Sequence, residues 1–409
     1  MASVTIFGSN NQHISLSFDP SANFALAQQL AQQINASVAD GQLITASDLN
    51  GPPPTLPSGT NGVFFQSTLK FVALPPGYTT DIVNVPGSAV VFDSGASDPT
   101  ILSDQATNLT FVDASGSGTV VAGGADSRLL VGGAGNWSLN TAAGHNVIIA
   151  AGSGNDSITA GGGNNAIQLG SGADLVVASG NDMIEGGTGA ETVDATGASG
   201  TFVQGNASDL LFIGGLGGAT ILGGSGSDTY FGSAAGPAGK QLIVGGSSGD
   251  NYLFAGDGAA TLTGVGNNDQ LFAYGTSNQV LTAGAGNETL TAALSSGADS
   301  LTAGSGNDTL IGGSGADTFV GGMGNATVMA GSGADVYAFI NHQAGGTELV
   351  QGIFDPSAIK ISLQGYGASA VAKALASQTE SNGSVTIALS DGTKVTFQDV
   401  TALHHSNFL

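Results

Sequence analysis

Aspartate recurs at a fixed spacing in the C-terminal half of the chain, and this spacing is the pattern best suited to chemistry. Between residues 303 and 339 a short unit is repeated as AGSGNDTLI, GGSGADTFV, GGMGNATVM and AGSGADVYAF. A nine-residue step leads from Asp308 to Asp317, and two further steps lead to Asp335. A regular series of carboxylates attracts multivalent cations, so the spacing suggests metal binding.

Short apolar segments follow these turns and must position the aspartates. Each unit is a glycine-rich turn followed by three residues of alternating or continuous apolar character. A strand this short cannot bury its own apolar face, so it is stable only when stacked on copies of itself. Similar triplets recur at intervals of 8 to 11 residues from about residue 78 to residue 340, which predicts stacked strands, two in each coil.

The composition supports a stacked β architecture and excludes several other classes. Of 409 residues 68 are glycine, without the three-residue period of collagen, and the 41% hydrophobic content argues against disorder. The net charge is −24, and residues 101–340 contain only Arg128 and Lys240 as basic residues. Such a chain repels nucleic acid and anionic lipid, so we expect no nucleic-acid partner.

Cysteine is absent, which excludes disulfides and thiolate chemistry and is compatible with export by a route that supplies no oxidant. The N-terminus lacks a basic segment followed by an apolar one, and no run of 18 apolar residues occurs. We therefore expect no membrane insertion and no cleaved N-terminal signal.

The chain is predicted to contain three regions: an α+β N-terminal cap or assembly region at 1–80, a parallel β-solenoid at 81–340, and a C-terminal cap at 341–409. Residues 4–7 and 14–18 alternate like two strands joined by a turn at 9–11.

A helix is predicted to follow, opened by residues 19–21 and continued by apolar residues from Phe24 to Val38. In the C-terminal region we predict a strand at 359–363, a helix at 368–376 and a hairpin at 385–400. End units of a stack must differ from internal ones, because open strand edges invite uncontrolled pairing.

The turns resemble the calcium-binding nonapeptide repeat of the RTX family, G-G-x-G-x-D-x-U-x, in which U is a large apolar residue. GGSGADTFV at 312–320 follows the pattern throughout. Close copies are AGSGNDTLI at 303–311, AGSGNDSIT at 151–159, LGSGADLVV at 169–177 and GGSGSDTYF at 223–231.

This resemblance implies a right-handed parallel β-roll, in which an aspartate and the aspartate two units later hold Ca²⁺ together with backbone carbonyls. Oxygen ligands in a flexible geometry suit calcium better than transition metals. An 18-residue separation joins Asp156 to Asp174, Asp299 to Asp317, and Asp317 to Asp335. Asp308 is a further candidate ligand, although Ala326 stands two units after it.

The alternative interpretation is that these Asp and Asn residues only form turns, since both tolerate left-handed backbone and cap their own main chain. Irregular steps, such as those from Asp174 to Asp182 or from Glu288 to Asp299, are expected to break the ligand register. Calcium is therefore predicted at a few sites.

No catalytic or organic-cofactor site is predicted, so we expect the chain not to be an enzyme. The sequence Gly-Gly-Ser-Ser-Gly at 245–249 fits the nucleophile pattern G-x-S-x-G, but it lies inside the repeats without the long strand and helix that such a nucleophile needs. There is no H-E-x-x-H zinc motif.

The end of the chain resembles the tails of RTX proteins exported by type I secretion, through the 383–400 hairpin and the final Ser-Asn-Phe-Leu. The leading hypothesis is a secreted, extracellular or cell-surface calcium-binding protein that self-assembles into an S-layer, biofilm matrix or filament. Its expected partners are other copies of itself and cell-surface polysaccharide. The alternatives are an adhesin or carbohydrate-binding module and, less favoured, a polysaccharide-modifying enzyme.

Overall fold

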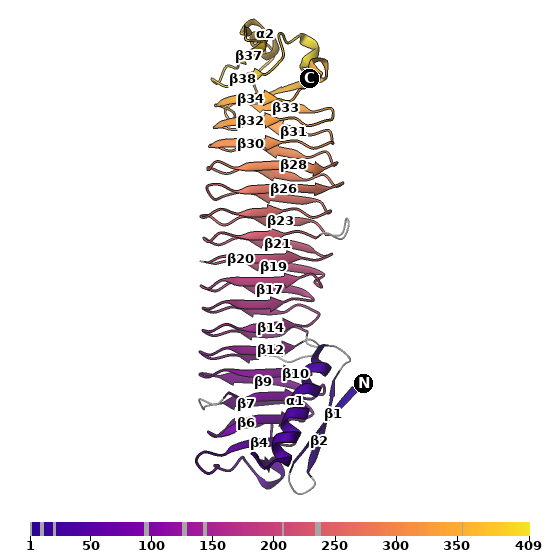
Figure 1. The fold of residues 1–409 in the computed structure, drawn as a ribbon, viewed down its shortest axis with the longest axis vertical. Helices are drawn as coiled ribbons and strands as arrows, with labels where there is room; N and C mark the ends of the chain where they lie inside the picture. The colour runs from indigo at the N-terminus through magenta and orange to yellow at the C-terminus, as the bar shows by residue number, and fades with distance from the viewer. Residues whose placement is uncertain are drawn as a thin grey trace. The chain divides into compact units, whose positions relative to one another are not determined.

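The computed structural model describes residues 2–8, 12–18, 22–93, 98–124, 129–141, 145–206, 208–233, 239–353 and 355–409. The chain divides into two compact units, residues 1–206 (unit 1) and 207–409 (unit 2). Each unit is nearly all β and winds as a parallel solenoid (Figure 1). The predicted fold class, a parallel β-solenoid with small α+β caps, is confirmed.

Unit 1 begins with a hairpin and a helix. Strands β1 (Ala2–Phe7) and β2 (His13–Phe18) pair antiparallel, with Ala2 opposite Phe18, and α1 (Ala22–Ala39) follows. Both the predicted hairpin and the predicted helix are confirmed. The residues predicted to form their turns, 9–11 and 19–21, lie outside the described residues.

The solenoid of unit 1 has two parallel sheets, and each strand pairs with the strand two places along the chain. A short 3-10 helix, η1 (Asp48–Asn50), follows β3. The first sheet contains β3 (Leu43–Ser47), β4 (Asn61–Gln66), β6 (Tyr78–Val83), β8 (Thr100–Ser103), β10 (Gly118–Ala122), β12 (Trp137–Thr141), β14 (Ser157–Ala160), β16 (Asp174–Val177) and β18 (Glu191–Ala195). The second contains β5 (Phe71–Leu74), β7 (Gly87–Asp93), β9 (Thr107–Asp113), β11 (Leu129–Val131), β13 (Ile148–Ala150), β15 (Ala166–Gln168), β17 (Asn181–Glu185) and β19 (Gly200–Gln204).

Unit 2 repeats this arrangement. Its first sheet contains β20 (Leu210–Gly214), β22 (Thr229–Phe231), β24 (Tyr252–Phe254), β26 (Gln270–Gly275), β28 (Thr289–Ser295), β30 (Asn307–Ile311), β32 (Asn325–Met329) and β34 (Thr347–Gln351). Its second contains β21 (Gly218–Leu222), β23 (Gln241–Val244), β25 (Ala260–Thr263), β27 (Val280–Thr282), β29 (Ser300–Thr302), β31 (Thr318–Val320), β33 (Val336–Ile340) and β35 (Lys360–Gln364).

The chain ends in a second α+β cap. After η2 (Pro356–Ala358) and β35 come α2 (Ala370–Ala376), β36 (Thr379–Ser381), β37 (Ser384–Ala388), β38 (Lys394–Phe397) and η3 (His405–Asn407). Strand β38 pairs antiparallel with β37 and parallel with β34, so it covers the last solenoid edge of the first sheet. The predicted strand, helix and hairpin of this region are confirmed.

The division at residues 80 and 340 remains a prediction, although the structure shows where parallel pairing begins and ends. Leu43 of β3 already lies opposite Asn61 of β4, within the region assigned to the N-terminal cap. Parallel pairing continues past residue 340, where Val336 of β33 lies opposite Lys360 of β35. The parallel ladder therefore extends into both regions that the sequence analysis assigned to caps.

Apolar side chains stack inside each coil, as predicted. In unit 2 the inward column of the first sheet includes Leu253, Leu271, Leu290 and Leu310, which face one another in register and are almost fully buried. Each fully buried Leu contributes on the order of 1.5–3 kcal/mol. These columns form the core that holds the turns in place.

One inward position in unit 1 holds a carboxylate. Asp81 lies between Phe64 and Ile101 in the register, is 0% exposed, and neither of its oxygens has a hydrogen-bond partner among the described residues. Burial, with the charge of Asp48 as a second cause, raises the pKa of Asp81 well above its ordinary value.

Replacing Asp81 by asparagine is expected to stabilise the protein increasingly as the pH rises. Because the folded-state pKa of Asp81 is raised, the folded chain holds its proton more tightly, and the stability of the wild type is lost as pH rises above the unfolded pKa. The difference in free energy of unfolding between Asp81→Asn and wild type should be near zero at pH 4 and should widen by up to about 1.4 kcal/mol per pH unit. Denaturant unfolding at several pH values measures it, and a constant gap would contradict the burial argument.

Candidate metal centre

The residue that ends each turn lies at the start of the next strand, and its side chain is buried at that point. We call these residues the ladder positions, because they lie in register from coil to coil. In the second sheet of unit 2 three successive ladder positions are Asp299, Asp317 and Asp335. The backbone N–H of Asp299 donates to Oδ1 of Asp317 at 2.9 Å, and the N–H of Asp317 donates to Oδ1 of Asp335 at 2.9 Å.

The first sheet of unit 2 has its own ladder. The backbone N–H of Glu288 donates to Oδ1 of Asp308 at 3.0 Å, and Asp269 precedes Glu288 in the same register. Asp308 lies opposite Ala326, as the sequence spacing predicted, so the run of carboxylates is interrupted there. Glu348 occupies the ladder position after Ala326.

Unit 1 has ladders of the same kind. The backbone N–H of Asp156 donates to Oδ1 of Asp174 at 2.9 Å, and Asp174 lies opposite Glu191. On the second sheet the N–H of Asn165 donates to Oδ1 of Asp182 at 3.1 Å. All three aspartate pairs predicted from the 18-residue spacing are therefore adjacent in the structure.

The expectation that irregular steps break the register was wrong. Ladder hydrogen bonds join residues 17 apart at Asn165 and Asp182, 20 apart at Glu288 and Asp308, and 23 apart at Asp228 and Asn251. Extra residues lengthen the loops, while the apolar columns keep the strands aligned. Asp174 and Asp182 are only eight residues apart in the sequence, but they lie on different sheets, so the step between them is not a step along one ladder.

Six ladder carboxylates were therefore missed by counting fixed steps along the sequence. Each lies two residues before a buried apolar or aromatic residue of its strand, and counting back from that residue would have found them. They are Asp182, Glu191, Asp228, Asp269, Glu288 and Glu348.

Several ladder carboxylates have a buried oxygen without a partner. Among the described residues, Oδ2 of Asp156, Asp174 and Asp299 and Oε2 of Glu288 accept no hydrogen bond. In contrast, Oδ2 of Asp317 accepts from the N–H of Gly313 at 2.8 Å. A buried carboxylate with an unpaired oxygen is costly, so these atoms are suited to a cation that approaches through the turns.

Raised pKa values of the ladder carboxyls also show that burying these charges costs free energy. Burial, together with neighbouring Asp308, raises the pKa of Glu288 to about 8. Burial raises the pKa of Glu348 to about 7 and, with Asp317 as a smaller cause, the pKa of Asp335 to about 6. The ladder is therefore a place where protons and cations compete for the same oxygens.

Glycine in the turns allows the coils to approach closely. Gly154, Gly172 and Gly333, at the fourth position of their repeats, have φ values of 143°, 139° and 146°, which side chains rarely permit. A Cβ atom on Gly172 would also collide with the carbonyl oxygen of Gly154 in the preceding coil. At these three positions glycine therefore serves both the backbone conformation and the stacking of the coils.

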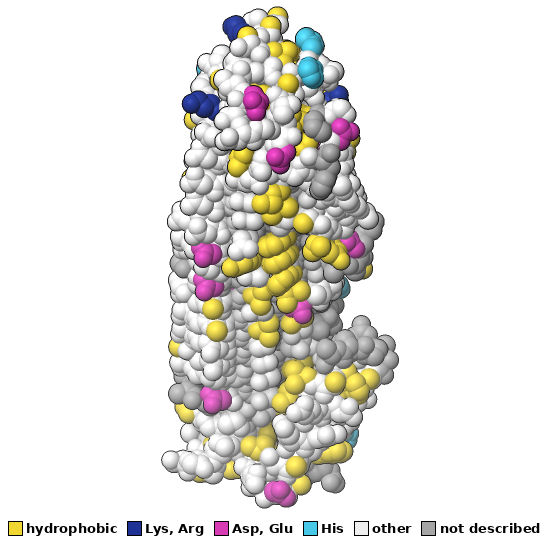
Figure 2. Space-filling view, turned by 45° about the horizontal axis from the view of Figure 1, so that its top comes forward, with side chains coloured by type: hydrophobic (Ala, Val, Ile, Leu, Met, Phe, Trp, Pro, Cys, Tyr) yellow, Lys and Arg dark blue, Asp and Glu magenta, His cyan; other side chains and the backbone are white. Residues whose placement is uncertain are grey.

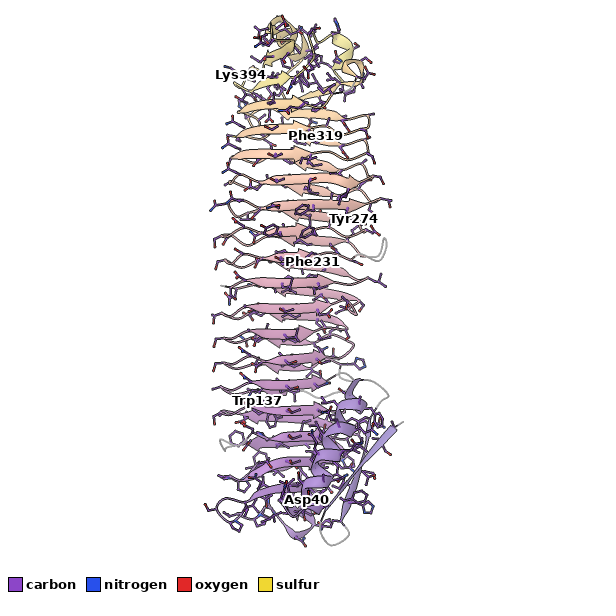
Figure 3. The ribbon with its side chains drawn as sticks, viewed as in Figure 1. Asp40, Trp137, Phe231, Tyr274, Phe319 and Lys394 are labelled. Atoms are coloured by element: carbon purple, nitrogen blue, oxygen red, sulfur yellow. The ribbon has the colours of Figure 1, made fainter. Side chains whose placement is uncertain are left out.

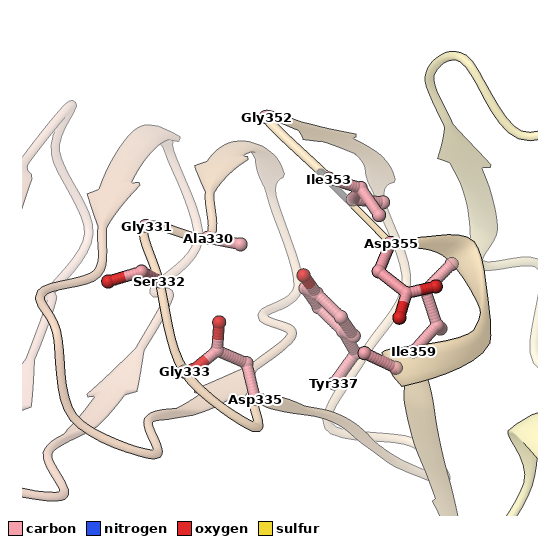
Figure 4. Close-up of a pocket in the computed structure, with 11 residues that line it drawn as sticks. Ala330, Gly331, Ser332, Gly333, Asp335, Tyr337, Gly352, Ile353, Asp355 and Ile359 are labelled. Carbon is pink, nitrogen blue, oxygen red and sulfur yellow. The ribbon is translucent and has the colours of Figure 1, made fainter.

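The last aspartate of the second-sheet ladder borders a cavity. Asp335 lies opposite Ile359, so the column of carboxylates ends at this coil. A cavity of about 180 Å³ opens beside it, lined by Asp335, Tyr337, Ile353 and Asp355 among others (Figure 4). Asp335 is therefore a ladder carboxylate with open space on one side.

Calcium fits this donor set. The sites offer only oxygen atoms, and unpaired buried carboxylate oxygens lie in the turns. Within the described residues no cluster of three or more Asp, Glu, His or Cys side chains forms a metal cage. Neighbouring ladder carboxylates would thus hold an ion with the help of turn carbonyls. A bound dication would supply the charge that lets these carboxylates stay ionised while buried.

Comparison with known families identifies the repeats. The model of the RTX calcium-binding nonapeptide repeat matches in four copies, at residues 143–176, 175–201, 245–280 and 295–328. This is an RTX-type repeat protein. No curated protein matches the chain.

The RTX repeats are calcium-binding repeats, and they cover most of the predicted ligands. Asp156 and Asp174 lie in the first matched copy, and Asp299, Asp308 and Asp317 lie in the last. Asp335 lies beyond the match but continues the column of Asp317. The assignment of individual ions to these six residues remains a prediction.

In the presence of a chelator, the RTX protein is expected to become less stable as the pH rises from 5 to 8.5. The folded-state pKa values of Asp335, Glu348 and Glu288 are raised, so the stability present below the unfolded pKa is lost as pH passes about 6, 7 and 8. Excess Ca²⁺ should reduce this loss, because the ion takes the place of the proton. Thermal unfolding across pH in EGTA and in Ca²⁺ measures both curves, and parallel curves would contradict the competition.

Proposed function

We propose that this chain is a secreted calcium-binding structural protein that self-assembles into a cell-surface layer, a biofilm matrix or an extracellular filament. We assign it no enzymatic activity. RTX repeat proteins are generally exported, and no helix in the described part of the chain is long and apolar enough to cross a membrane.

The observation that carries the proposal is the exposure of large apolar side chains on the solenoid strands. Phe71 is 62% exposed, Met183 55% and Leu294 74%, in a chain whose mean hydropathy is +0.21. Figure 2 shows hydrophobic side chains gathered on one face, with few charged side chains among them. Large apolar side chains exposed away from charges are typical of protein–protein contact surfaces.

Calcium would control the assembly through the fold. The ladder carboxylates carry much of the negative charge, and an ion between them offsets their repulsion and stabilises the coils. Outside a cell, where calcium is abundant, the solenoid would be fully formed, and its exposed apolar side chains would lie on ordered strands.

Electron microscopy of the purified chain tests this proposal. We expect sheets, fibres or other regular assemblies in millimolar Ca²⁺ and their loss in excess EGTA. Only monomers at high concentration in Ca²⁺ would contradict self-assembly.

Export is tested separately. We expect a variant lacking residues 341–409 to remain inside a producing cell that has a type I secretion system, while the full chain reaches the medium. Normal secretion of the shortened chain would show that this region is not the export signal.

A further inference from the structure

One face of unit 2 carries an aromatic column. The first sheet places Phe231, Phe254 and Phe272 in register on the outward side of successive strands. Their rings are stacked, with centroids 5.0 Å apart and 16° between planes for the first pair, and 4.3 Å and 7° for the second. Figure 3 marks Phe231 on this sheet.

Further apolar side chains widen this column. Tyr252 is 38% exposed, Tyr274 48% and Leu294 74%, and Tyr274 lies opposite Leu294 in the register of β26 and β28. We call Phe231, Tyr252, Phe254, Phe272, Tyr274 and Leu294 the aromatic stripe. Phe231 itself remains 42% exposed, so among the described residues nothing seals the stripe from water.

Unit 1 shows what an apolar column at this position does in the same chain. There the corresponding outward positions hold Phe65, Ile82, Leu102 and Val121, which are at most 2% exposed. The hairpin and α1 cover them, and the cluster includes Ile6, Leu16, Phe18 and Ala27 from these elements. An apolar column on the outside of this sheet is therefore a packing surface in unit 1.

The charge around the stripe indicates its partner. The outward positions of β22, β24, β26 and β28 hold only apolar and uncharged polar residues, whereas the whole chain has a net charge of −24. Another copy of so acidic a chain is repelled where charges face each other, and it can approach closely where they are absent. Sheets with apolar outer faces pack against each other at about 10 Å.

We propose that the aromatic stripe is the contact through which two copies of this chain pair face to face. The inference rests on the proposed function, because it names the surface used in self-association. The contact is isologous: the stripe of one copy meets the same stripe of the second, and the pair closes. Layers or filaments then grow from such pairs through other surfaces.

Sedimentation velocity of the full chain in Ca²⁺ tests the pairing. The double variant Phe254→Thr with Phe272→Thr removes two stacked rings, and threonine already occupies the next outward position of the column at Thr291. We expect the dimer Kd to rise at least tenfold without a change in Tm. The matched control, Leu175→Thr with Ile148→Thr, removes exposed apolar side chains of unit 1 and should form dimers like wild type.

Cross-linking gives a second readout that does not depend on these variants. The chain has no cysteine, so a single Thr291→Cys substitution provides one thiol, and a short bismaleimide should link two copies within the pair. Leu175→Cys should give no covalent dimer. These results would support the stripe even if the threonine variant folded poorly.

The outcomes separate this inference from the proposed function. If the threonine variant pairs as wild type does and Thr291→Cys does not cross-link, the stripe is not the contact, while self-assembly stands. If wild type stays monomeric in Ca²⁺, both ideas fail. If monomers bind polysaccharide and the threonine variant does not, the stripe is a glycan platform and the pairing is overturned.

Discussion

Replacing Leu290 by alanine is expected to lower the free energy of unfolding by about 2–5 kcal/mol. Leu290 is 0% exposed and lies in register between Leu271 and Leu310, so truncation leaves a cavity in the middle of the inward column. Each coil is stable only through its neighbours, and the cavity weakens the contact on both sides. Urea unfolding in saturating Ca²⁺ measures the loss.

Leu294→Ala is the matched control, because Leu294 lies on the same strand and is 74% exposed. It should change the stability by less than about 0.5 kcal/mol. If both substitutions cost the same, the apolar columns would not be what holds the coils together.

The second large effect is expected from Asp174→Asn, and its sign depends on calcium. Asp174 lies between Asp156 and Glu191 on its ladder, and its Oδ2 is buried without a partner among the described residues. In EGTA the variant should be at least as stable as wild type, because a buried charge has been removed. In Ca²⁺ the variant should be less stable than wild type by about 3 kcal/mol, if it has lost one calcium site and free Ca²⁺ is roughly 100 times the Kd of that site.

Asp40→Asn provides the control for charge alone. Asp40 is exposed at the end of α1, away from the ladders, so this substitution should leave the Ca²⁺-dependent gain in stability unchanged. A loss of calcium response in both variants would assign the effect of Asp174→Asn to net charge rather than to a site.

The local elements followed from the sequence because each depends on nearby residues. Alternation in residues 4–7 and 14–18 predicted β1 and β2, and helical spacing after residue 21 predicted α1. Glycine-rich turns followed by apolar triplets predicted the coils. What they did not reveal is that the hairpin and α1 cover Phe65 and Ile82, because that contact joins residues far apart in the chain.

The candidate site was only partly predictable for a related reason. Asp156 and Asp174 were identified because their coil has the regular 18 residues. Glu288 and Asp308 were not paired, because their coil has 20. Loop length varies freely on the surface while the columns of buried side chains fix the register, so spacing along the sequence is a poorer guide than position relative to the strand.

The central claim is that calcium bound at the ladder carboxylates stabilises the solenoid, and thermal unfolding of the wild type tests it most directly. The Tm should fall when Ca²⁺ is replaced by millimolar EGTA and return when excess Ca²⁺ is added back. An identical melting curve in EGTA and in Ca²⁺ would contradict the claim and leave the aspartates as turn-forming residues only.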